Sequence, residues 1–170
     1  DAKDMASYAR WLVHESDYAT VITHHNVDDV FGNLISTADG KGLMDSTGVI
    51  YTFLPTLDAT YQDLVKDGRV SVTFTEKAMA QSSCPGAIEN GACGRVTCHG
   101  RLTPVPEENA SLAKEFLYAR HHFMKLWSMT HSFVPYWLAP GNITEIYSVN
   151  QDGPHEVVTK ITWNEYIAAP

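Results

Sequence analysis

Apolar and polar residues alternate along several short segments of the chain. The sharpest case is residues 69–75, where Val70, Val72 and Phe74 would face one side and polar residues the other. This alternation is typical of a half-buried antiparallel strand. Residues 49–54 are apolar or aromatic at nearly every position, which is typical of a strand that is covered on both faces.

The same patterns, with the turn signals between them, predict the remaining elements. Further strands are expected at residues 18–24, 33–38, 94–102, 133–138, 143–149 and 156–159. Helices are expected at residues 4–14, 58–66, from Pro106 onward and at 162–167. The third helix should bury Leu112, Ala113, Phe116 and Leu117, and Gly68 should end the second in a left-handed conformation. Residues 40–48 contain three glycines without apolar periodicity, so a loop is expected there.

Many strands with a few inserted helices favour a mainly β fold with flanking helices, arranged as an antiparallel β-barrel. The length of 170 residues suits one domain with its own core. No internal repeat, linker or low-complexity tract divides the sequence. We therefore expect residues 1–170 to form a single domain.

Composition and charge narrow the class of protein further. Apolar residues make up 44% and charged residues 19% of the chain, which argues against disorder and against a fibrous repeat. The net charge is -8 and the cations are scattered singly, so direct binding of DNA or RNA is not expected. No stretch approaches the roughly 20 apolar residues of a membrane-spanning helix.

Three cysteines, Cys84, Cys93 and Cys98, lie within a short stretch whose spacing matches no zinc motif. Cys84 and Cys93 flank turn-forming residues that would let them approach to disulfide distance. Closing so small a loop would stabilise the fold by about 2–3 kcal/mol. Three free thiols in a cytosolic protein are the alternative. Cys98 shares a strand face with Val96 and is interpreted as a small buried residue.

Two triplets have the form of N-glycosylation acceptors, Asn109-Ala-Ser111 and Asn142-Ile-Thr144. Asn142 follows Pro140-Gly141, a turn just before a strand, which suits a glycan. Asn109 lies on the side of its helix that carries the buried residues. It would be accessible if the first helical turn faces solvent.

No catalytic or metal-ligating motif is recognisable. The histidine pairs His24-His25 and His121-His122 would diverge on a strand or a helix, so neither is expected to chelate one ion. Neither a Ser-His-Asp arrangement nor a paired-carboxylate motif is present. Trp127, Trp137 and Tyr136, near His131, could stack on an aromatic ligand, although burial in the barrel or at a subunit interface is the favoured interpretation.

The chain resembles the CREG family of secreted glycoproteins over nearly its whole length. The segments that carry the resemblance are 14–17, 64–75, 112–121, Met124-Lys125 with Trp127, 131–133, Leu138 with 142–144, and Trp163 with Glu165-Tyr166. Together these segments are specific, although no single one would be.

The resemblance implies a six-stranded Greek-key split β-barrel related to the pyridoxamine-phosphate oxidases. It also implies a homodimer, N-glycosylation, and secretion or an endolysosomal location. Roles in growth and differentiation through a cell-surface or lysosomal-sorting receptor belong to the same expectation. Cys84 and Cys93 match the family's disulfide and Asn142 matches a glycan position, whereas Asn109 is displaced from the family's nearby acceptor.

Flavin oxidases of this fold carry a Ser-Arg-Lys run after a Tyr-Thr strand, and a flavin phosphate requires such cations. The corresponding place after Tyr51-Thr52 reads Thr56-Leu-Asp-Ala-Thr60, which removes both cations and adds Asp58. We therefore expect no cofactor and no enzymatic activity. An FMN-dependent oxidoreductase is the alternative function. A protein-interaction module on the same barrel is a third hypothesis.

Overall fold

The structure is a computed structural model that describes residues 2–42, 45–79, 84, 87, 93–127, 132–139, 141–152 and 155–170. Its helices are α1 (Ala2–Glu15), α2 (Ala59–Lys66), the 3-10 helix η1 (Glu76–Ala78), α3 (Glu107–Arg120), α4 (Met124–Trp127) and α5 (Trp163–Ala168). Its strands are β1 (Tyr18–His24), β2 (Val30–Lys41), β3 (Asp45–Pro55), β4 (Arg69–Thr75), β5 (Arg95–Arg101), β6 (Thr103–Pro104), β7 (Phe133–Leu138), β8 (Ile143–Asp152) and β9 (His155–Ile161).

The nine strands form one antiparallel sheet in the order β6-β7-β3-β2-β1-β4-β5-β8-β9. The fold class predicted from the sequence is confirmed, but the expected number of six strands is wrong. β6 contains only Thr103 and Pro104, and such a short strand leaves no alternating pattern in the sequence. None of the helices in the described part of the chain is long and apolar enough to cross a membrane.

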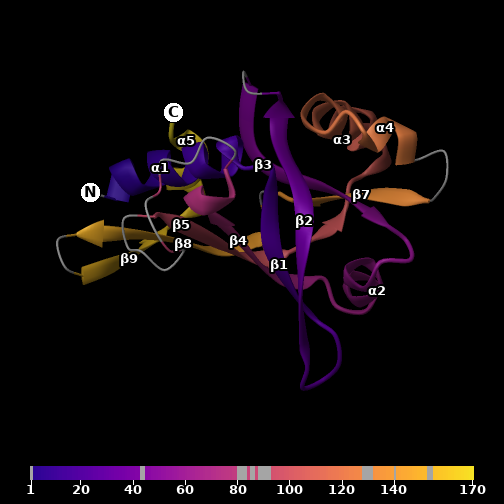
Figure 1. The fold of residues 1–170 in the computed structure, drawn as a ribbon, viewed down its shortest axis with the longest axis horizontal. Coiled ribbons are helices and arrows are strands. Elements are labelled where there is room, and N and C mark those ends of the chain that lie inside the picture. The colour runs from indigo at the N-terminus through magenta and orange to yellow at the C-terminus, as the bar shows by residue number, and fades with distance from the viewer. Residues whose placement is uncertain are drawn as a thin grey trace.

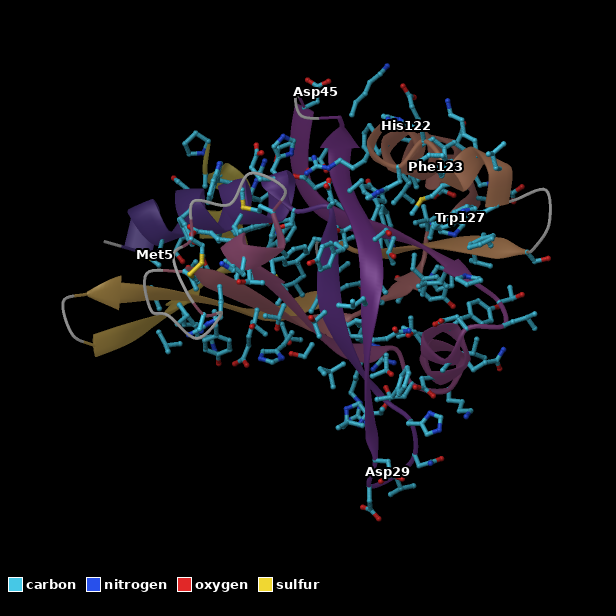
Figure 2. The ribbon with its side chains drawn as sticks, viewed as in Figure 1. Met5, Asp29, Asp45, His122, Phe123 and Trp127 are labelled. Atoms are coloured by element: carbon cyan, nitrogen blue, oxygen red, sulfur yellow. A yellow bond between two sulfur atoms is a disulfide. The ribbon has the colours of Figure 1, made fainter. Side chains whose placement is uncertain are left out.

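Helices cover the sheet in two places (Figure 1). α1 and α5 lie together with both ends of the chain at one end of the molecule, and α3 and α4 lie at the other. α2 lies near the end of β1 that is remote from both groups. α3 packs against β2 at Ala38, and the rest of the outer side of β1 and β2 has no helix in front of it in this view (Figures 1 and 2).

The main core lies between α1, α5 and the inner face of the sheet. Val70, Val72 and Phe74 are all buried in it, which confirms the alternation seen in β4. Tyr166 of α5 is fully buried there, and its hydroxyl donates a hydrogen bond to the Gly48 carbonyl at 3.1 Å. α5 begins with a capping box between Thr162 and Glu165, which fixes where this helix starts.

A smaller core lies between α3 and the strands β3 and β7. Ala113, Phe116 and Leu117 are buried in this cluster as predicted. Leu112 is 43% exposed, so its predicted burial is wrong. Because consecutive helical residues differ by about 100°, Leu112 lies at the edge of the stripe that the other three define.

The expected loop at residues 40–48 is wrong for residues 40–41 and 45–48, which belong to the paired strands β2 and β3, while residues 43–44 lie outside the described residues. Gly40 pairs with Ser46, and the register shifts between Ala38 and Gly40. A Cβ atom at Gly40 would lie 1.3 Å from the carbonyl oxygen of Asp45. Glycine is therefore required here for a close approach of two backbones within a strand rather than for a loop.

α2 begins where the sequence predicted, because the Asp58 side chain accepts a hydrogen bond from the backbone N–H of Thr60 at 2.8 Å. It also ends at Lys66 as predicted, but without the expected left-handed residue. The capping residue Asp67 is extended, and Gly68 is not among the described glycines with positive φ. A Cβ at Gly68 would come within 3.0 Å of the Leu102 carbonyl oxygen, so close packing is the reason for this glycine.

Candidate functional site

The cysteines adopt the expected states. Cys84 and Cys93 are joined in a disulfide with a Cα separation of 5.2 Å. The Lys77 ammonium donates a hydrogen bond to the Cys84 carbonyl at 3.2 Å, which links the disulfide to η1. Cys98 is fully buried, and burial raises the pKa of its thiol to about 12. Since the thiolate is the reactive form, Cys98 is not a nucleophile at neutral pH.

The Asn142 acceptor triplet lies at the turn between β7 and β8, next to Gly141, whose φ is +81°. The Asn142 side chain is half-buried and donates a hydrogen bond from Nδ2 to Thr103 Oγ1 at 3.0 Å. Thr144 is exposed. An amide nitrogen that carries a glycan keeps one hydrogen, so the contact with Thr103 is compatible with glycosylation.

The Asn109 triplet lies in the first turn of α3. The Asn109 side chain is half-buried, and its backbone N–H donates to the Pro106 carbonyl at 2.9 Å. Ser111 is exposed. The side chain is thus neither fully exposed nor enclosed in the core, and occupancy of this position stays a prediction.

The place where a flavin would be expected is next to Thr56–Thr60. Two neighbouring pockets of about 140 and 280 Å³ open there and share Pro55 and Asp58 in their linings. Neither lining contains a Lys or Arg among the described residues. Asp58 accepts a hydrogen bond from Thr60 N and another, at 3.4 Å, from Asn33 Nδ2. The beginning of α2 is therefore already capped by a carboxylate.

These residues do not fit FMN. A phosphate next to the Asp58 carboxylate would face a like charge without a cation to offset it. Thr52 Oγ1 is buried in the same area and has no hydrogen-bond partner among the described residues. A single hydroxyl does not replace two cations, so the structure provides no phosphate site in this pair of pockets.

The aromatic residues considered as a stacking platform lie apart. Trp127 is 40% exposed and stacks on Phe133 with ring centroids 5.5 Å apart. Trp137 packs instead with Tyr51 in the smaller core, at 6.1 Å between centroids. His131 lies outside the described residues. Trp127 and Trp137 thus do not form one ligand platform.

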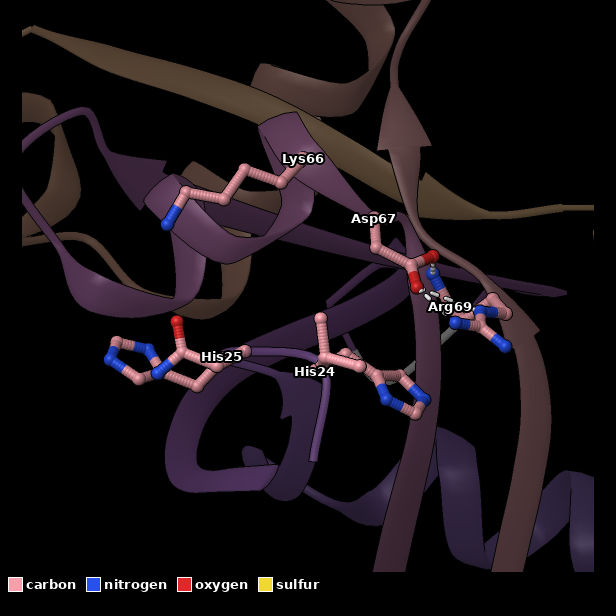
Figure 3. A pocket seen from close by; sticks show the side chains of 7 residues that line it. His24, His25, Lys66, Asp67 and Arg69 are labelled. Carbon is pink, nitrogen blue, oxygen red and sulfur yellow. Dashed lines mark hydrogen bonds and ion pairs between the residues drawn. The ribbon is translucent and has the colours of Figure 1, made fainter. Parts of the chain in front are cut away.

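A larger pocket of about 460 Å³ lies at the end of β1, where the sequence predicted no site (Figure 3). His24 and His25 both line it, although neighbours on a strand were expected to face opposite sides. β1 ends at His24, so His25 lies outside the strand and is not bound by its alternation. Lys66, Asp67 and Arg69 approach from the end of α2 and from β4.

A buried carboxylate orients His25. The Asp63 side chain is fully buried, and one of its oxygens lies 2.9 Å from His25 Nδ1. The hydroxyl of Thr23 donates to the other oxygen at 2.8 Å. No local motif predicts this arrangement, because Asp63 lies on α2, 38 residues after His25.

A second histidine–carboxylate pair lies inside the fold. His14 Nδ1 is 2.6 Å from Asp39 Oδ1, and the Ser46 hydroxyl donates to Asp39 Oδ2 at 2.6 Å. Since Ser46 contacts the carboxylate and not the imidazole, this is not a nucleophile–base arrangement. The described residues contain no group of three or more His, Cys, Asp or Glu side chains placed to hold a metal ion.

Comparison with solved structures defines the class of fold. A heme-binding protein from Mycobacterium smegmatis superposes with a TM-score of 0.75 at 16% identity, over 96% of this chain and 60% of that one. A general-stress-protein-26 relative of the pyridoxinephosphate oxidase family from Clostridium acetobutylicum superposes with a TM-score of 0.60 at 10% identity, over 94% and 96%. The protein therefore has the split β-barrel fold that these two structures share.

The family follows from sequence comparison. Residues 1–168 match the family model described as CREG, beta-barrel, so the chain belongs to the CREG family. It is 28% identical to chicken CREG1, over 92% of this chain and 83% of that protein, and 28% identical to human CREG1, over 92% and 72%. It is 29% identical to mouse CREG2, in an alignment that covers 89% of this chain but only 54% of that relative.

Proposed function

We propose that the protein is a non-catalytic glycoprotein of the secretory pathway or the endolysosomal lumen. In this proposal residues 1–170 act as one split-barrel unit that binds a second copy of the chain and a sorting or cell-surface receptor. The observation that carries it is the absence of a cationic phosphate site beside Asp58, among the described residues, in a member of the CREG family. A barrel without its flavin phosphate site has lost the usual means of redox catalysis in this fold.

The disulfide and the acceptor triplets support the proposed location. Disulfides persist mainly in oxidising compartments, and Cys84 and Cys93 are bonded. Asn142 lies on a turn beside the exposed Thr144, where an attached glycan would extend into solvent. Glycans at Asn142 and Asn109 would in turn provide a binding site for a sorting receptor.

The outer side of β1 and β2 supports a homodimer. Four large apolar side chains are exposed on the same face of these paired strands, namely Tyr18, Ile22, Val30 and Leu34. Two more exposed apolar side chains are Leu57, just after the end of β3, and Trp127 on α4. A monomer rarely leaves so large an apolar patch in water, so this face is the proposed dimer interface.

Light scattering on protein from secreting cells, before and after enzymatic deglycosylation, tests the glycan and the dimer together. We expect a polypeptide mass of twice the chain mass of 18.9 kDa and a loss of mass on deglycosylation. Asn142→Gln should remove the larger share of that loss, and Asn109→Gln the remainder. Material that carries no glycan and stays monomeric would contradict the proposal.

A further inference from the structure

The pocket at the end of β1 concentrates positive charge in an acidic protein. The cationic side chains there are Lys66 and Arg69 in the lining and Arg101 beside it, against the carboxylates Asp63 and Asp67. Asp67 is paired with Arg69 and lies 3.7 Å from Arg101. Lys66 has no carboxylate within ion-pair distance among the described residues. The whole chain, by contrast, carries a net charge of -8.

The side chains approach the pocket from opposite sides (Figure 3). Lys66 extends toward the side on which the His25 ring lies, and the His24 ring lies on the other side, beside the Asp67–Arg69 pair. The acidic residues of the β1–β2 turn, Asp28 and Asp29, are not part of the pocket lining.

The contact with Asp63 fixes the orientation of the His25 ring. Asp63 is fully buried, and His25 is its one cationic partner within ion-pair distance among the described residues. The contact holds the His25 ring with Nδ1 toward the buried carboxylate and Nε2 away from it. The His25 side chain is itself 47% exposed, which leaves its other nitrogen accessible from the pocket.

The orientation of the ring decides what this accessible nitrogen can do. With Nδ1 bonded to Asp63, a neutral His25 presents a lone pair at Nε2, which repels an anion. The imidazolium instead presents an N–H donor at Nε2. A charge-assisted hydrogen bond to an oxyanion then becomes possible, with the Lys66 ammonium as the second cation.

We propose that this pocket binds a compact oxyanion, a phosphate or sulfate group, through protonated His25 and Lys66. Thr23 and Asp63 act as positioning residues that hold the imidazole ring. A protonated His24, which also lines the pocket, would add a third positive charge. The site is separate from the two pockets beside Asp58. It does not depend on the glycoprotein function proposed above.

Inorganic sulfate is the probe, because its charge does not change between mildly acidic and neutral solution. Binding is followed by NMR at constant ionic strength, through the side-chain resonances of His24 and His25. Sulfate should bind about tenfold more tightly at about pH 5.5 than at about pH 7.5, since one charge-assisted hydrogen bond is gained. The resonances of the other described histidines should not shift on addition of sulfate.

Lys66→Met keeps the aliphatic stem of the side chain and should weaken sulfate binding about fivefold at acidic pH. Lys114→Met, on the exposed face of α3, is the matched control and should leave binding unchanged. His25→Gln should remove most of the pH dependence and leave only the share that comes from His24, and the spectrum of the variant reports whether it is folded. Sulfate-induced shifts that never saturate, or equal affinities for Lys66→Met and the native protein, would overturn the proposal.

Discussion

Replacing Asp39 with alanine is expected to lower the free energy of unfolding by about 3–5 kcal/mol, the usual cost of leaving a buried charged network without one partner. Asp39 is buried on β2 and accepts hydrogen bonds from His14 of α1 and Ser46 of β3. Ser46 in turn accepts from Arg10 at 2.8 Å, and Arg10 donates to the Ile167 carbonyl of α5 at 3.1 Å. Asp39 thus connects both terminal helices to the β2–β3 hairpin.

Chemical denaturation of the disulfide-intact protein measures this loss. Glu145→Ala is the matched control, because Glu145 forms an exposed pair with Lys160 at 2.6 Å. Exposed pairs contribute little, so the control should unfold close to the native protein. Equal midpoints for the two variants would show that the network around Asp39 does not hold the terminal helices.

Replacing Gly40 with alanine is expected to cost about 3 kcal/mol, at the upper end of the range for over-packed sites. The added Cβ would lie 1.3 Å from the Asp45 carbonyl oxygen and 2.5 Å from its carbonyl carbon. Both atoms belong to the backbone, so the two strands must separate at the point where the hairpin register shifts.

Gly32→Ala, on the same strand, is the internal control. Its Cβ would lie 3.3 Å from Ile22 Cδ1, which can move because it is the end of a flexible side chain. We expect only a small change in the denaturation midpoint for this variant. If Gly40→Ala were tolerated as well as Gly32→Ala, the pairing of Gly40 with Ser46 described here would be wrong.

The elements that the sequence predicted best are those whose formation depends on residues within the element itself. The bounds of β1 and β4 were predicted correctly, because the β-branched residues of β1 and the alternation in β4 are visible in each strand alone. The hairpin at Gly40 was missed because the reason for that glycine is the backbone of Asp45, which only the folded strand pair brings close. β6 was missed because two residues are too short to show a period.

The candidate sites follow the same rule. The residues around Asp58 could be assessed from sequence, since the missing cations and the added carboxylate lie in one short run. The pocket lined by His24 and His25 could not be predicted, because its orienting partner Asp63 comes from a helix later in the chain. Pairings between elements of this kind depend on topology and leave no spacing signal.

The described residues around Asp58 offer no cation for a flavin phosphate, and a fluorescence titration of the purified protein with FMN tests this conclusion. Riboflavin, which lacks the phosphate, is titrated in parallel. With sulfate in excess to occupy the pocket at the end of β1, we expect no saturable quenching by FMN and no preference for FMN over riboflavin. Saturable binding of one FMN per chain, tighter than that of riboflavin, would contradict it.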